Sequence, residues 1–329
     1  MHCELVVPGL FSQPPAARHA GLELLLARGR ATSAASQSLE RWLHDAFGLE
    51  DEAVAAGALT LIANGGDAGD SSWARADPVH LRLMRDRLIV APSAAFSVKP
   101  EEAHALCETL TRHFAGTAEF SAPHPERWCA RFAEPLELDC PPPLEVAGRD
   151  VDLCLSGSAA ATRLLNEAQM LLHAHPVNEA REARGEPAIN SVWLWGAGRA
   201  PRNAESRWQS VAGDDPVALG LARLAGARQR SVAPSAESWL ERLPEDGRHL
   251  AVLDALRAPL ALAEPADYRQ CIESLEKRWF APLLEALRAG RVGMVTIHVP
   301  DAAQATSFET IRGDLRRFWR RPRALEHYA

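Results

Sequence analysis

Long apolar stretches are missing from this chain of 329 residues. No window approaches the 18 or so consecutive apolar residues that a membrane-spanning helix needs, which argues against an integral membrane protein. The segment Met1–Leu10 has neither a basic start nor a long apolar run, so we expect no secretion signal. These absences predict a cytoplasmic protein without a membrane partner.

Cysteine spacing of the kind that binds zinc is also missing. No two cysteines form a C-x-x-C pair, and their scattered positions suggest no disulfide framework. We therefore expect free and mostly buried thiols in a reducing compartment. The six cysteines are Cys3, Cys107, Cys129, Cys140, Cys154 and Cys271.

An excess of positive charge is absent as well. The formal net charge is -7 and the isoelectric point is about 6.0, so the surface offers nucleic acid no electrostatic footprint and we expect no such partner. Lysine is nearly absent, and one arginine-rich run near the C-terminus is predicted to be the solvated face of a helix. Its members are Arg312, Arg316, Arg317, Arg320, Arg321 and Arg323.

What the chain does have is an ordinary globular composition, with 47% hydrophobic and 24% charged residues. Strand and helix patterns alternate along it. Glu4–Val7 and Val292–Val299 are typical of buried strands, whereas Leu22–Arg28 and the longer Pro265–Arg288 are typical of helices. This alternation predicts an α/β fold.

The region between residues 76 and 156 has a different texture. Two strand patterns, His80–Met84 and Arg87–Val90, predict a hairpin, and a helix is expected from Pro100 to about Phe114. A further strand is expected at Trp128–Phe132. These elements predict a small α+β domain inserted into the larger fold.

The densest motif runs from His175-Pro-Val-Asn178 through Arg181 to Asn190 and closes on Gly196-Ala-Gly198. In order and spacing it resembles the hallmark of the archaeal-type cofactor-independent phosphoglycerate mutases of the alkaline phosphatase superfamily. The patterns D-P-V-H-L, N-E-x-Q-M and W-L-W-G are closer still to the RpfE-type regulatory, mutase-like proteins of proteobacteria. The segment from Asp77 to Val90 is similar to the start of the substrate domain that the mutase family carries as an insertion.

The resemblance implies a fold and a set of substrate contacts. It implies an alkaline-phosphatase-like core from residues 1–75 and 157–329, with residues 76–156 inserted as the α+β domain. It also implies a phosphate-binding role for Arg127 and ligand contacts for Asn178, Arg181 and Asn190. The residues themselves leave an alternative open, because Asn178 is placed to cap a helix and Arg181 to pair with a nearby glutamate.

The chemistry of that family needs two divalent ions, held by aspartate and histidine ligands, beside a serine or threonine nucleophile. Here the first strand ends in Val7-Pro8-Gly9, where the family carries a metal-binding aspartate. Ser33 is a weak candidate for the nucleophile, and His298 is a weak candidate for a surviving ligand. The loop 91–96 lacks the arginines of the family's substrate loop.

Three functions follow from these observations. The first is a catalytically degenerate, mutase-like protein with a regulatory or binding role, no cofactor, and a small phosphorylated ligand or a protein as partner. The second is a phosphomutase or phosphatase that uses manganese, magnesium or zinc at a rearranged site. The third is a scaffold that uses tryptophans and the arginine-rich run. The rearranged site would draw on Asp214, Asp215, Asp254, His298 and Asp301.

Overall fold

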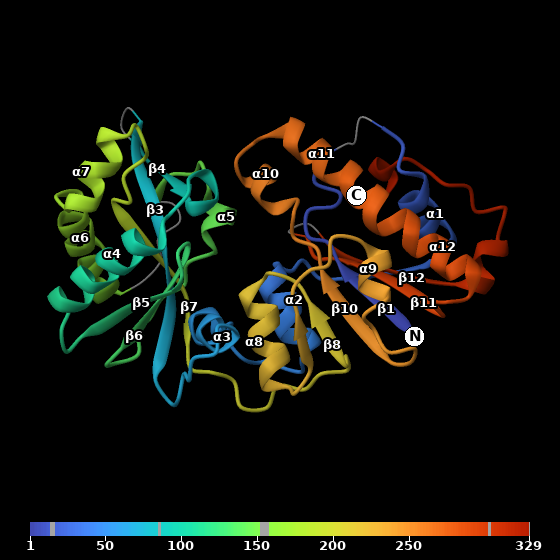
Figure 1. Cartoon of the computed structure of the whole chain (residues 1–329), viewed down its shortest axis with the longest axis horizontal. Coiled ribbons are helices and arrows are strands. Elements are labelled where there is room, and N and C mark those ends of the chain that lie inside the picture. Colours follow the sequence, from blue (N-terminus) through green and yellow to red (C-terminus); the bar gives the residue numbers. More distant parts are fainter. Residues whose placement is uncertain (14–16, 85–86, 152–157, 302–303, 329) are drawn as a thin grey trace. The chain divides into compact units, whose positions relative to one another are not determined.

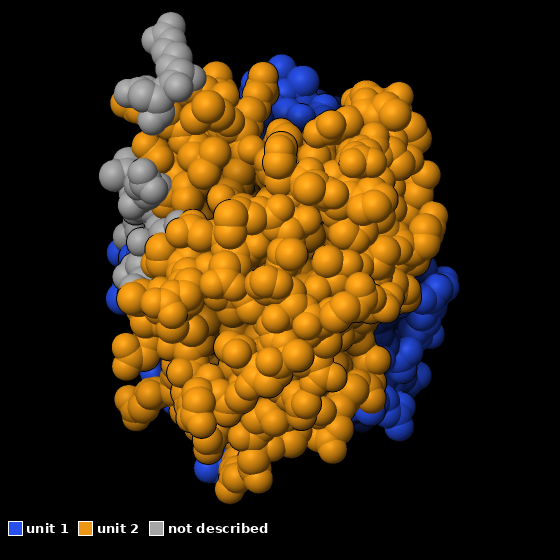
Figure 2. Space-filling model, turned by 90° about the vertical axis from the view of Figure 1, so that its left-hand side faces the viewer, with its two compact units in different colours: residues 1–50, 203–329 blue, residues 51–202 orange. Residues whose placement is uncertain are grey.

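The computed structural model describes residues 1–13, 17–84, 87–151, 158–301 and 304–328. The chain divides into two compact units, one made of residues 1–50 and 203–329 and the other of residues 51–202 (Figure 2). Each unit has its own sheet and its own hydrophobic core. Among these residues, no helix has the length and apolar character required to cross a membrane.

The first unit is built on a seven-stranded sheet in the order β2-β12-β11-β1-β10-β8-β9 (Figure 1). Strands β12 and β2 join antiparallel at one edge, and the other neighbours run parallel. The strands are β1 (His2–Val6), β2 (Arg30–Ala34), β8 (Ser210–Ala212), β9 (Arg228–Arg230), β10 (Arg248–Val252), β11 (Met294–Val299) and β12 (Ala305–Ile311).

One face of this sheet is covered by α1, α9, α11 and α12, and α2 and α8 belong to the opposite side (Figure 1). Alternate residues of β1 face the first of these layers, where Cys3 and Leu5 are fully buried. The helices of the unit are α1 (Ala20–Arg28), α2 (Leu39–Ala46), α8 (Pro216–Leu224), α9 (Ala236–Leu240), α10 (Arg257–Ala261), α11 (Pro265–Leu275) and α12 (Ala281–Ala289).

The opposite face of the sheet is unusually polar. Parallel strands are normally apolar on both faces, because helices bury both. Here the alternate positions of β1 carry His2 and Glu4, and those of β11 carry Thr296 and His298. Helix α2 covers part of this face, with the ring of Trp42 centred 4.8 Å from the ring of His298. This polar face holds the candidate site.

The helix expected at Pro265–Arg288 is continuous but not uniform. A π-helical turn, Glu276–Phe280, joins α11 to α12, and the helix ends at Gly290 in the left-handed conformation. Glu276 accepts hydrogen bonds from the backbone N–H groups of Gly21 (2.7 Å) and Leu22 (3.0 Å). The carboxylate thereby satisfies donors at the positive end of α1.

The second unit has an antiparallel sheet in which the long strand β3 pairs with β4, β6 and β7, and β5 pairs with β6. Helices α4 and α6 lie on one face and α3 on the other (Figure 1). The strands are β3 (Ser72–Met84), β4 (Arg87–Pro92), β5 (Ala118–His124), β6 (Arg127–Phe132) and β7 (Ser191–Gly198). The helices are α3 (Ala56–Ala63), α4 (Pro100–His113), α5 (Pro143–Val146), α6 (Ala159–His173) and α7 (Pro176–Ala183).

The division into units differs from the expected boundaries at residues 75/76 and 156/157. Strand β7, expected in the core, pairs with β3 from Trp73 to Val79 and so belongs to the second unit. Helix α3 joins it as well, because Gly57 lies directly on the backbone of Ala74. A Cβ atom at Gly57 would stand 2.3 Å from the Ala74 carbonyl carbon.

The expected helix in the C-terminal arginine run is wrong. The chain forms a short 3-10 helix at Arg312–Arg316 and then turns. Arg317 and Arg320 donate to the backbone carbonyls of Arg28 (3.3 Å) and Gly29 (2.7 Å) at the end of α1. Pro322 prevents a helix from continuing through the run, and these arginines instead satisfy carbonyls that the end of α1 leaves open.

The α/β class, with sheets flanked by helices, is confirmed. The thiols also follow expectation where the structure describes them. Cys3, Cys107, Cys129 and Cys271 carry free thiols, and the first three of these are buried, as is Cys140. Cys154 lies outside the described residues.

Candidate functional site

The polar face of the seven-stranded sheet contains a cavity of about 370 Å³, which we call the sheet-face pocket. Four adjacent strands, β2, β12, β11 and β1, form its floor, and β10 and the segment before β8 each add an arginine. Its lining residues are His2, Glu4, Arg30, Thr32, Arg207, Arg248, Thr296, His298, Ser307 and Glu309.

Glu4 is the central charge of the pocket and is only 1% exposed. One carboxylate oxygen accepts from Arg248 Nε at 2.9 Å, and the other accepts from Arg207 at 3.2 Å. The second oxygen also lies 3.0 Å from His298 Nε2. Burial alone would raise the pKa of Glu4, but the hydrogen bond from His298 and the charge of Arg207 lower that pKa to about 2. Glu4 is therefore ionised at neutral pH.

His298 links Glu4 to a serine. Its Nδ1 atom lies 2.8 Å from Ser307 Oγ, because His298 and Ser307 are direct cross-strand neighbours on β11 and β12. A carboxylate can only accept, so Glu4 places the ring proton on Nε2 and leaves Nδ1 to accept from the serine hydroxyl. Burial lowers the pKa of His298 against the opposing effect of Glu4. The pocket thus contains a Ser307–His298–Glu4 chain with a neutral imidazole in its middle.

Positive charge exceeds negative charge in the pocket. Its three arginines face two glutamates, and the histidines His2 and His298 both have a lowered pKa, chiefly because of burial. The side chains of Arg207 and Arg248 remain 44% and 43% exposed, so their free N–H groups can reach an incoming ligand. Guanidinium groups bind carboxylate and phosphate oxygens in pairs. The arrangement therefore suits a small anion.

A second cluster of three charged side chains lies beyond the carboxyl ends of β10 and β8. Arg257 follows β10, Asp215 follows β8, and Glu40 comes from α2. Arg257 donates to Glu40 at 2.8 Å and lies 4.0 Å from Asp215. Burial and the charge of Glu40 raise the pKa of Asp215 to about 6, and its Oδ1 atom caps α8 through the Ala218 N–H. A buried guanidinium, held by the protein itself, balances these carboxylates.

The carboxyl ends of the parallel strands are where an α/β fold usually binds its ligands, and where the resemblance would place two metal ions. Within the described ranges, no group of three or more His, Cys, Asp or Glu side chains is placed to hold a metal ion. His298, the expected survivor, is engaged with Glu4 and Ser307. The described residues thus do not fit a dinuclear metal centre, and the structure does not assemble the rearranged set of four aspartates and His298.

Ser33, the predicted nucleophile, lies on the exposed edge strand β2, where it pairs in register with Thr306. Its neighbour Thr32 lines the sheet-face pocket, and because successive strand residues point to opposite faces, Ser33 points away from it. The structure does not bring Ser33 together with His298.

Asn178 lies inside the first turn of α7 and does not have the expected helix-capping position, since the N-cap residue is His175. Its side-chain amide is 1% exposed and donates to the carbonyls of Leu172 (2.7 Å) and Ile189 (2.9 Å). Its oxygen accepts from the Ile189 N–H at 2.7 Å. These backbone bonds tie α7 to the segment that leads into β7, which is a structural role.

Arg181 is also 1% exposed, and its guanidinium group donates hydrogen bonds to three acceptors within the protein. It donates to Glu102 (2.6 Å) and to the carbonyls of Ser97 (3.0 Å) and Pro187 (2.7 Å). Glu186, a glutamate near Arg181 in the sequence, lies 3.8 Å away and is the weaker contact. The main partner, Glu102, comes from α4, which the sequence did not reveal.

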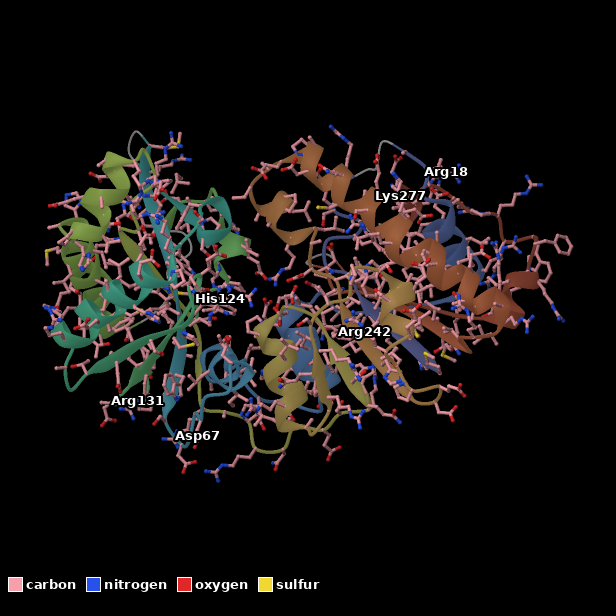
Figure 3. All side chains as sticks on the ribbon, viewed as in Figure 1. Arg18, Asp67, His124, Arg131, Arg242 and Lys277 are labelled. Carbon is pink, nitrogen blue, oxygen red and sulfur yellow. The ribbon has the colours of Figure 1, made fainter. Side chains whose placement is uncertain are left out.

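Asn190 has a comparable role at the start of β7. It both accepts from the backbone N–H of Leu81 (2.7 Å) and donates to the Leu81 carbonyl (2.9 Å), and so fixes the end of β3. Arg127 is the first residue of β6. Its positive charge acts to lower the pKa of Asp77 and the pKa of His124, the last residue of β5 (Figure 3). A phosphate contact by Arg127 stays a prediction.

Sequence reasoning missed Glu4, Arg207, Arg248 and Ser307. One signal was present, because β1 reads His-x-Glu and β11 reads Thr-x-His at alternate positions. Polar alternation within strands that should be buried on both faces indicates a sheet face that binds something.

Comparison with known proteins gives partial sequence matches. No family model matches the chain. It is 30% identical over 116 residues to the 2,3-bisphosphoglycerate-independent phosphoglycerate mutase of Methanosarcina barkeri, a match covering 33% of this chain and 29% of that protein. It is 25% identical over 197 residues to the enzyme of the same name from Methanosarcina acetivorans, covering 53% and 49%. These matches span about half the length of the curated relatives or less.

Among solved structures, the PH0037 protein from Pyrococcus horikoshii is similar in fold. The TM-score is 0.57 at 14% sequence identity, over 94% of this chain and 87% of that one. At this identity the likeness concerns the fold alone. The chain is therefore similar, at low identity and over part of its length, to cofactor-independent phosphoglycerate mutases.

Proposed function

We propose that this chain is a mutase-like protein that binds a small phosphorylated anion in the sheet-face pocket and acts through binding, in a regulatory role. The observation that carries the proposal is the fixed pair of arginines, Arg207 and Arg248, held by the buried carboxylate of Glu4. Their positions are set before any ligand arrives, which reduces the entropy cost of binding.

Two further points support a role other than metal-dependent phosphoryl transfer. Arg257 neutralises carboxylates beside the strand ends, where the mutase chemistry would require metal ions. The regulatory part of the proposal rests on the resemblance of the sequence motifs to those of the RpfE-type proteins. The hydrogen bonds of Asn178 and Arg181 go to the protein itself. These two motif residues therefore stabilise the fold, and the proposed anion site lies elsewhere.

The proposal predicts that Arg248→Gln weakens anion binding. A charge-assisted hydrogen bond contributes about 1.5–3 kcal/mol, so we expect the dissociation constant for inorganic phosphate or 3-phosphoglycerate to rise about 10- to 100-fold. Isothermal titration calorimetry on the full chain measures this directly. Circular dichroism checks that the variant remains folded despite the lost contact with Glu4.

The matched control is Arg131→Gln. Arg131 lies on β6 of the other unit (Figure 3), pairs with Glu119 and is 50% exposed. The Arg131→Gln variant should bind phosphate with the same dissociation constant as the wild type. Equal binding by the Arg248 variant and the wild type would contradict the proposed site.

A second function, as a scaffold, is favoured by one observation near the C-terminus. Phe318 and Trp319 pack edge to face at 5.3 Å and remain 78% and 66% exposed. If they form an interface, the wild type should sediment as more than one 35.8 kDa chain, and the double change Phe318→Ser with Trp319→Ser should sediment as a single chain. A wild-type monomer at all concentrations would exclude self-assembly through this pair.

A further inference from the structure

We propose that Ser307 is an activated nucleophile, and that the Ser307–His298–Glu4 chain hydrolyses a small ester that carries an anionic group. The chemistry needs no metal ion. The inference rests on the proposed anion site for its substrate class, but it concerns a covalent step that binding alone does not require.

The geometry supplies each part that such a nucleophile needs. Ser307 is half-buried and lines the sheet-face pocket, so its hydroxyl faces the cavity as well as His298. The distances from Ser307 Oγ to His298 Nδ1 (2.8 Å) and from His298 Nε2 to Glu4 (3.0 Å) are both hydrogen-bonding distances. A serine, a base that accepts its proton and an acid that orients the base form the arrangement that activates serine nucleophiles.

The surroundings hold His298 in place. The Trp42 ring packs against the imidazole, and the His298 side chain is 9% exposed. Glu4 is fixed in turn by Arg207 and Arg248. Because both ring nitrogens have partners, rotation of the ring would break two hydrogen bonds at once, so the base keeps the tautomer that accepts from Ser307.

The proposed step is acyl transfer to the serine. Ser307 Oγ forms a bond to the carbonyl carbon of the ester while its proton moves to His298 Nδ1. The ester C–O bond then breaks, and the departing alkoxide takes that proton and leaves as the alcohol. A water molecule attacks the acyl-serine, gives a proton to His298, and releases the carboxylic acid as the serine recovers its proton.

The pocket also defines the substrate class. Arg30, Arg207 and Arg248 provide an excess of positive charge, so the ester should carry a carboxylate or phosphate group. The cavity of about 370 Å³ is near the lower limit of usual ligand sites, which favours a small molecule. The Thr32 hydroxyl and the Arg30 guanidinium are hydrogen-bond donors on the strand beside Ser307.

The test is covalent labelling of the full chain with a small fluorophosphonate. Ser307 Oγ would bond to phosphorus as the P–F bond breaks, and the hydroxyl proton would leave through His298 with fluoride. Intact mass spectrometry should show one adduct per chain, and peptide mapping should place it on Ser307. Ser307→Ala should show no adduct. The labelling rate of His298→Gln should be lower than that of the wild type by about 100-fold or more.

Two controls separate this inference from the proposed anion site. Ser33→Ala, on the other side of β2, should label at the wild-type rate, and excess inorganic phosphate should slow labelling of the wild type. If phosphate binds but Ser307 stays unlabelled, the nucleophile is refuted while the anion site stands. Labelling of another residue, or equal labelling of the His298 variant, also overturns the inference. Labelling of Ser307 that phosphate does not slow would refute the shared site.

Discussion

Replacing Arg181 with alanine is expected to lower the free energy of unfolding by about 3–5 kcal/mol. The change leaves Glu102 without its main counter-charge, and the Glu102 side chain is only 8% exposed. It also removes donors from the Ser97 and Pro187 carbonyls. Urea denaturation followed by circular dichroism measures the loss, and hydrogen exchange should assign it to residues 51–202.

Arg184→Ala is the matched control, because Arg184 contacts the same carboxylate. It lies 2.7 Å from Glu102, but its side chain is 38% exposed and it shares the contact with Glu186. Because the Arg184 guanidinium is solvated and its contact is shared, we expect Arg184→Ala to lose much less stability than Arg181→Ala. Similar losses for the two arginines would contradict the structural role of Arg181. A large loss of phosphate binding in a folded Arg181 variant would restore the ligand role that the motif first suggested.

Arg257→Ala is expected to have a comparably large effect in the other unit, of about 3–5 kcal/mol at pH 7. It leaves two nearly buried carboxylates without their shared cation, since Glu40 and Asp215 are 4% and 7% exposed. Arg257→Lys keeps a positive charge and should lose less, although its ammonium group cannot reproduce the planar guanidinium contacts. Urea denaturation of the three proteins gives the comparison.

The loss caused by Arg257→Ala should depend on pH. The pKa of Asp215 is already raised to about 6 in the folded protein, chiefly by burial, and removal of the guanidinium charge raises it further. When the pKa of a carboxyl group is raised in the folded state, the contribution of that group to stability is present at low pH. This contribution is lost as the pH rises through the folded-state pKa. The deficit should therefore be smaller at pH 5 than at pH 7. A deficit that is equal at both values would show that Asp215 and Arg257 are not coupled.

Many secondary elements could be predicted from the sequence, because their signals are local. The apolar runs of β1 and β11, the proline at the start of α4 and the helical pattern of α1 each depend on a few adjacent residues. The hairpin of β3 and β4 could be predicted for the same reason, although β3 begins eight residues before the predicted strand.

The division into units and the candidate pocket depend on contacts between distant residues, which no local pattern contains. Strand β7 belongs with β3 because residues more than 110 positions apart pair in register, as Val79 does with Ser191. Glu4 meets Arg207, Arg248 and His298 only when four separated segments form one sheet face. A single sequence shows that Glu4 is an acid within an apolar strand, but not what it contacts.

The central claim is that the chain binds a phosphorylated anion in the sheet-face pocket without help from a metal ion. Calorimetric titration of the full wild-type chain with inorganic phosphate tests it, once in a chelating buffer and once with added manganese. We expect one saturable site with a dissociation constant between about 1 μM and 1 mM, the same in both buffers. Binding that appears only with manganese, or no binding in either buffer, would contradict this claim.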